Sequence, residues 1–153
     1  MALVDQEVLA QTKKDYILQA QHIKKYFPIR SGIFKRTVGH VKAVDDVSLD
    51  IYRGETLGIV GESGSGKSTF GRVILRLLDA TDGEIIFDNK NITRMSNRAL
   101  RPIRKDMQIV FQDPYASLNS MMNVEQLIEE PLIVQTKMSK AERREKVAEI
   151  LEK

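Results

Sequence analysis

A run of glycine and hydroxyl residues that ends in a lysine carries the clearest chemistry in this sequence. It fits the pattern G-x-x-x-x-G-K-[ST] and is followed by Thr69: Gly61, Glu62, Ser63, Gly64, Ser65, Gly66, Lys67 and Ser68. Glycines let the backbone curl so that several N–H groups point at one anion. Lys67 can place its charge on the β and γ phosphates of a nucleotide, and the Ser68 hydroxyl can bind Mg²⁺. A glycine turn without a ligand is the alternative, and the flanking elements decide between the two.

Those flanking elements favour phosphate binding. Residues 57–60 are continuously apolar and lie between Gly54 and Gly61, a pattern typical of a strand buried on both faces of a parallel sheet. After the loop, apolar residues fall on one face of a helix: Phe70, Val73, Ile74, Leu77 and Leu78. A helix that begins at Lys67 would add the positive end of its dipole. The sequence therefore predicts a nucleotide-binding loop between a strand and a helix.

The remaining pattern predicts an α/β fold. Strands are expected over residues 16–23, 47–51 and 107–111, a hairpin over 84–88 and 91–93, and a loop over 28–39. Helices are expected near Ser96 and from Val124 onward. Ser139 and Glu142 match the capping box of a last helix, whose apolar stripe is Val147, Ile150 and Leu151.

Composition narrows the classes of function. The chain has 153 residues, 24 Lys and Arg against 21 Asp and Glu, a net charge of +3 and no cysteine. The absence of cysteine rules out disulfides, cysteine zinc sites and thiol nucleophiles within these residues. So small an excess of positive charge does not indicate binding to nucleic acid. No apolar run reaches the roughly 20 residues that span a bilayer, so a membrane role would need a partner.

Two further segments resemble one family. Residues 44–51 with Gly54 and Glu55, and residues 109–119 (Ile-Val-Phe-Gln-Asp-Pro-Tyr-Ala-Ser-Leu-Asn), are similar to the ATP-binding subunits of ABC transporters of the dipeptide, oligopeptide and nickel importer subfamily. The resemblance covers residues 16–153. It implies an ABC-type P-loop NTPase with a parallel core sheet, an antiparallel β subdomain and a partial helical subdomain, C-terminally incomplete. The implied division is an arm over 1–15, an ATP-binding core over 16–113 and the start of the helical subdomain over 114–153.

The resemblance also implies ligands and roles. ATP and Mg²⁺ would be bound, with Tyr26 stacking on adenine, or Phe27 in its place; Tyr26 as a core aromatic is the alternative. Gln112 would contact Mg²⁺ and the attacking water, and with Lys67 would form the catalytic set. Apolar residues after Gln112 would receive a helix of a membrane subunit, or else belong to the subdomain core: Tyr115, Leu118, Met121 and Met122. Ser120 departs from the proline of many relatives.

Partners and limits follow from the same resemblance. Transmembrane permease subunits and a second ATP-binding subunit would be the partners, at the cytoplasmic face of the membrane, with no nucleic acid. No LSGGQ segment, second acidic motif or switch histidine occurs in the chain, so the chain alone is expected to be inactive in hydrolysis. The strand that would pair with residues 57–60 also follows that segment in the family.

Two alternative functions stay open at this point. One is a non-catalytic nucleotide-binding fragment. The other is a soluble ABC-type ATPase of DNA repair or translation, although residues 111–119 resemble importers instead. A basic cluster is expected to be a solvated face or a contact for phosphates or lipid headgroups: Arg98, Arg101, Arg104 and Lys105.

Overall fold

The computed structural model describes residues 15–32 and 36–152, and these form two compact units that divide between Arg98 and Ala99. The first unit holds β1 (Tyr16–Ser31), β2 (Arg36–Tyr52), α2 (Lys67–Ile74), β3 (Asp82–Phe87) and β4 (Lys90–Asn91). The short α3 (Asn97–Leu100) spans the division, and the second unit continues with η1 (Ile103–Lys105), α4 (Pro114–Ser117), α5 (Val124–Gln135) and α6 (Lys140–Leu151). The predicted arm over 1–15 lies almost wholly outside the described residues. The predicted boundary at 113/114 stays a prediction.

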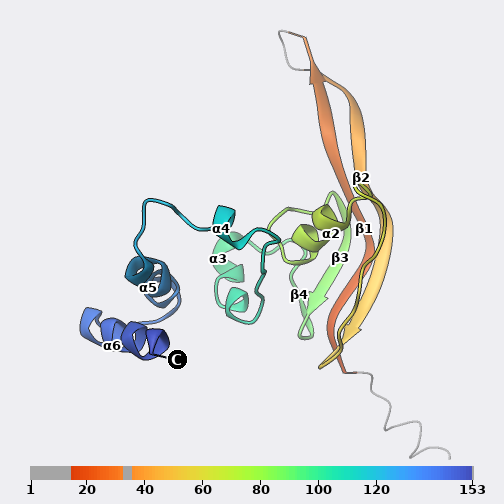
Figure 1. Ribbon diagram of the computed structural model, residues 1–153. Coiled ribbons are helices and arrows are strands. Elements are labelled where there is room, and N and C mark those ends of the chain that lie inside the picture. Colours follow the sequence, from red (N-terminus) through yellow and green to blue (C-terminus); the bar gives the residue numbers. More distant parts are fainter. Residues whose placement is uncertain (1–14, 33–35, 153) are drawn as a thin grey trace, which may run out of the picture. The chain divides into compact units, whose positions relative to one another are not determined.

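The first unit is built on an antiparallel sheet of four strands in the order β2-β1-β3-β4. β1 pairs with β2 from end to end, whereas β3 pairs with β1 only between Leu18 and Lys24. The β1–β2 hairpin therefore runs well past the rest of the sheet (Figure 1). The helix α2 packs against β1 and β2, which brings the residues that precede it to the sheet.

A small apolar core joins α2 to the sheet. Phe70 and Val73 of α2 are buried, as are apolar residues of the strands and the following segment: Leu18, Ala20, Ile23, Val44, Ile85, Phe87 and Ile92. The buried Arg76 guanidinium follows α2 and donates to the carbonyls of Ile92 and Met95 at 2.9 and 3.1 Å and to Asp79 at 2.6 Å. These hydrogen bonds tie the end of α2 to the segment after β4.

Several predictions that rest on short sequence patterns are confirmed. The 84–93 hairpin forms, with its turn at Asp88 and Asn89, one residue earlier than expected; both have positive φ, as a type I′ turn requires. α6 begins with the predicted Ser139–Glu142 capping box, and α5 has its own box, formed by Asn123 and Gln126. Helix formation at Lys67 is also confirmed, although α2 ends at Ile74.

The expected loop over residues 28–39 is wrong. Both of its ends continue as strands, with Pro28 opposite His40 and Ile29 opposite Gly39. Pro28 is tolerated there because, among the strands that the structure describes, none besides β2 pairs with β1 beyond Lys24, and proline occurs on strand edges where no N–H is needed. Pairing between β1 and β2 therefore decides the conformation of this segment. Turn-forming residue types such as glycine and proline do not reveal that pairing.

The two predicted buried strands are also wrong. Neither 57–60 nor 107–111 forms a strand, and Val60 and Val110 are 94% and 92% exposed. A strand needs hydrogen-bonded neighbours for its N–H and C=O groups, and within residues 15–32 and 36–152 no strand pairs with either segment. The sheet seen in the described part of the chain is the antiparallel one, without the parallel core that was expected.

Candidate nucleotide-binding site

The glycine loop is held in a conformation that only glycine adopts easily. Gly64 and Gly66 have φ values of 81° and 91°, in the left-handed region. Gly66 is the N-cap of α2, so the loop leads directly into the first turn of the helix. The loop therefore ends where the free N–H groups and positive dipole end of a helix can receive an anion.

Gly66 also lies against the sheet. A Cβ atom at this position would come within 2.1 Å of the carbonyl oxygen of Ala43 in β2, whereas a Cβ at Gly64 would meet nothing within 4 Å. The backbone of β2 and the backbone of the loop thus touch at one point. This contact sets the distance between the start of α2 and the sheet.

Lys67 lies folded over the loop. Its ammonium group donates to the carbonyl oxygens of Gly61 and Glu62 at 2.7 and 2.5 Å and to the Ser65 hydroxyl at 3.2 Å. These hydrogen bonds hold the positive charge against the loop. A phosphate that enters the loop would compete for the same three donor protons, and its negative charge makes it the stronger acceptor.

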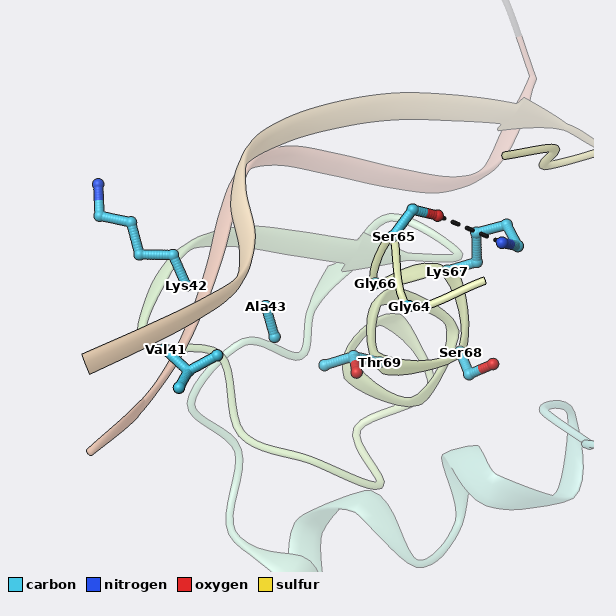
Figure 2. Close-up of a pocket in the computed structure, with 9 residues that line it drawn as sticks. All are labelled: Val41, Lys42, Ala43, Gly64, Ser65, Gly66, Lys67, Ser68 and Thr69. Atoms are coloured by element: carbon cyan, nitrogen blue, oxygen red, sulfur yellow. Dashed lines mark hydrogen bonds between the residues drawn. The ribbon is translucent and has the colours of Figure 1, made fainter. Parts of the chain in front are cut away.

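A cavity of about 440 Å³ lies beside the loop. The residues that line it come from β2, from the glycine loop and from the start of α2: Val41, Lys42, Ala43, Gly64, Ser65, Gly66, Lys67, Ser68 and Thr69. Figure 2 shows Val41 and Ala43 projecting from the opposite side of β2 to Lys42, whose side chain extends away from the loop. The three β2 residues carry no phosphate-binding motif, and sequence reasoning missed them.

Tyr26, the predicted adenine contact, forms a cluster with Asp45 and Lys42. Its hydroxyl donates to Asp45, and the Lys42 ammonium donates to the same carboxylate at 3.0 Å while lying 5.2 Å from the centre of the Tyr26 ring. The hydrogen bonds from Tyr26 and Lys42 hold the pKa of Asp45 below its ordinary value. Asp45 in turn raises the pKa of Tyr26 and of Lys42, in both cases chiefly through these hydrogen bonds.

The strand register separates Tyr26 from Phe27. Tyr26 is opposite Lys42, and Phe27 is opposite Val41. Directly opposed residues share one face of a sheet, so Phe27 belongs to the side of the hairpin from which Val41 reaches the cavity. Tyr26 belongs to the side of Lys42, which points away (Figure 2). This geometry favours the alternative aromatic, Phe27, as the residue beside a bound base.

The remaining predicted residues lie in the second unit. Gln112 is exposed and follows the irregular segment 107–111. Three of the residues predicted to meet a membrane subunit are exposed, namely Tyr115, Leu118 and Met121, and Met122 is half-buried. Exposure agrees better with a contact surface than with the alternative of a subdomain core.

The residues at the loop fit Mg²⁺ held through a nucleotide. No group of three His, Cys, Asp or Glu side chains in the described residues could hold a metal by itself. Ser68 lines the loop cavity with a hydroxyl, and Mg²⁺ characteristically takes few protein ligands together with phosphate oxygens and water. Among the helices that the structure describes, none is long and apolar enough to cross a membrane.

Comparison with known proteins defines the class. The sequence profile of the ABC transporter family matches residues 44–153. A solved structure titled "Dimeric structure of a post-hydrolysis state of the ATP-binding cassette MJ0796 bound to ADP and Pi" superposes with a TM-score of 0.71 at 31% identity, over 88% of this chain and 56% of that one. The chain belongs to the ABC transporter family and has the fold of its ATP-binding cassette.

The chain is also similar to named ATP-binding proteins of oligopeptide and dipeptide transport. The chain is 51% identical to the oligopeptide transport ATP-binding protein AppF of Bacillus subtilis over 139 residues, and this match covers 90% of the chain. It is 45% identical over 137 residues to the dipeptide transport ATP-binding protein DppF of Haemophilus influenzae. It spans about two fifths of the length of both proteins (42%). The family and subfamily inferred from the sequence are thus confirmed.

Proposed function

We propose that this chain binds Mg-ATP as the phosphate-binding part of an ATP-binding subunit of a peptide importer. The observation that supports this most directly is the glycine loop, which leads into α2 and holds the Lys67 ammonium against its own carbonyl groups. The names of the relatives support the transport role.

Each part of the loop would have its own role in binding the nucleotide and Mg²⁺. Backbone N–H groups between Gly61 and Lys67 and the amino end of α2 would bind the phosphates, and Lys67 would neutralise the β and γ phosphates. The Ser68 hydroxyl would take one Mg²⁺ position. When bound, Mg²⁺ supplies charge neutralisation along the phosphate chain. Gln112 would orient the attacking water.

Partners and location are part of the proposal. Permease subunits would bind at the exposed residues Tyr115, Leu118 and Met121, and a second ATP-binding subunit would complete the hydrolytic site. The protein would then be held at the cytoplasmic face of the membrane through the permease. By itself the chain would bind nucleotide without sustained turnover, since the signature segment does not occur in it.

Calorimetric titration with Mg-ATP tests the proposal. Lys67→Ala should weaken binding by about 10–200-fold, because a charged hydrogen bond is worth roughly 1.5–3 kcal/mol. Lys90→Ala, which removes an exposed lysine of β4 in the same unit, is the matched control and should bind as the unaltered chain does. Equal affinities for the Lys67→Ala and Lys90→Ala chains would contradict the assignment of the loop.

A further inference from the structure

The contact between β2 and the glycine loop lies at an irregular point of the pairing between β1 and β2. Lys25 is opposite Val44, and the next residue, Tyr26, is opposite Lys42, so the register leaves out Ala43. An extra residue in one strand is a β-bulge, which bends that strand and increases its twist. The carbonyl oxygen of Ala43 is the atom that a Cβ at position 66 would meet at 2.1 Å. The bulge therefore determines where β2 touches the loop.

Side chains on either side of this bulge are hydrogen-bonded to each other. Lys42 precedes Ala43 and Asp45 follows Val44, and the Lys42 ammonium donates to the Asp45 carboxylate at 3.0 Å. The Tyr26 hydroxyl, which comes from the other strand, donates to the same carboxylate. We refer to Tyr26, Lys42 and Asp45 as the clamp. Its hydrogen bonds join both ends of residues 42–45 to each other and to β1, which holds the bulge in one conformation.

A second cavity lies between the clamp and the glycine loop. Its volume is about 460 Å³, and Lys42 and Asp45 line it together with Gly61, Gly66 and Lys67. The Lys42 side chain nevertheless extends away from the loop, on the opposite side of β2 from Ala43 (Figure 2). The clamp would therefore act on a bound nucleotide through the backbone of β2 and not by direct contact.

We propose that the three residues of the clamp are positioning residues for the glycine loop. They would hold the Ala43 carbonyl oxygen at the place where it meets Gly66, and so set the amino end of α2 for a phosphate. This inference rests on the proposed nucleotide binding. It gives Tyr26 a role that differs from stacking on a base, because the hydroxyl of Tyr26 would matter and the base of the ligand would not.

Calorimetric titration with Mg-ATP and with tripolyphosphate tests the role of the hydroxyl. Tyr26→Phe keeps the ring and removes the hydrogen bond to Asp45. It should weaken the binding of both ligands by the same factor, about two- to fivefold, since interactions of exposed groups are weak. Tyr16→Phe removes a hydroxyl from the first residue of β1 and, as the matched control, should bind both ligands as the unaltered chain does. Unchanged binding by Tyr26→Phe, or a loss for ATP alone, would overturn the proposal.

A double variant tests whether Tyr26 and Asp45 act through one contact. Asp45→Ala removes the acceptor of both clamp hydrogen bonds and should weaken both ligands at least as much as Tyr26→Phe does. Adding Tyr26→Phe to the Asp45→Ala chain should cause no further loss, because the effects of residues that share one contact do not add. Losses that multiply in the double variant would overturn the proposal.

Nuclear magnetic resonance of the glycine-labelled chain tests the positioning without a nucleotide. Tyr26→Phe and Asp45→Ala should both shift the amide resonance of Gly66, because the Ala43 carbonyl beside it moves, and Tyr16→Phe should leave that resonance in place. A Gly66 resonance that Tyr26→Phe does not shift would overturn the proposal. If the unaltered chain bound neither ATP nor tripolyphosphate, the proposed function would fail, and these spectra would still decide whether the clamp positions the loop.

Discussion

Replacing Gly66 by alanine should disrupt the nucleotide-binding loop far more than the same change at Gly64. Both glycines have φ in the left-handed region, at 91° and 81°, so an alanine pays a similar backbone cost at either position. They differ in what a Cβ meets. At Gly66 it would lie 2.1 Å from the Ala43 carbonyl oxygen, and at Gly64 it would meet nothing within 4 Å. Gly64→Ala is therefore a control for backbone strain alone.

The expected loss of folding stability has two contributions, the backbone conformation and the steric overlap of the new Cβ. The left-handed conformation costs a side chain about 1–2 kcal/mol, which is the whole expected effect of Gly64→Ala. Gly66→Ala adds a steric term, because the oxygen and the new carbon must separate by about 1 Å, and overpacking of this kind costs about 1–3 kcal/mol. For a chain of this size, each kcal/mol corresponds to roughly 2–4 °C in Tm.

Urea and thermal unfolding followed by circular dichroism would measure the difference, together with Mg-ATP titration of each variant. Gly66→Ala should be the less stable variant by about 1–3 kcal/mol and should bind Mg-ATP more weakly, because α2 must move away from β2. Equal stability of the two variants would show that the contact between the loop and β2 is not a constraint on the fold.

Three further outcomes are expected. Phe27→Ala should weaken ATP binding by about 0.5–1.5 kcal/mol without affecting tripolyphosphate, whereas a loss of ATP binding confined to Tyr26→Ala would restore Tyr26 as the adenine contact. Asp45 has a lowered pKa in the folded chain, so its contribution to stability is complete above its ordinary pKa of about 4 and is lost as pH falls through the folded value. Urea unfolding of Asp45→Asn should therefore depend less on pH below about pH 4. Arg76→Met leaves the buried Ile92 carbonyl and the partly buried Met95 carbonyl without their donor and should cost about 1–3 kcal/mol in urea unfolding, whereas the exposed Arg72→Met should cost less than about 0.5 kcal/mol.

The features that could be predicted from the sequence are those determined by interactions between residues close together in the chain. A capping box needs only a hydroxyl and a carboxylate three residues apart, so Ser139 and Glu142 predict the start of α6. The glycine loop likewise specifies its own turn and the helix at Lys67. In both cases the deciding groups lie within a few residues of one another.

The features that failed depend on distant partners. Residues 57–60 have the composition of a buried strand, but composition does not supply the neighbouring strand that would pair with them. The choice between Tyr26 and Phe27 stays a prediction for a related reason. A register shift lies between Lys25 and Tyr26, and one residue of shift exchanges the two faces of a strand. No residue type in the sequence marks where that shift occurs.

The contact between Gly66 and Ala43 has a consequence for how this site would appear in a set of aligned relatives. One of its two partners is a main-chain carbonyl, which every amino acid at position 43 provides equally. No substitution at position 43 can therefore compensate for a side chain at position 66. Methods that infer contacts from paired substitutions would see an invariant glycine with no correlated position. The contact that joins the loop to the sheet is therefore seen in the structure but produces no correlated pair of substitutions in aligned sequences.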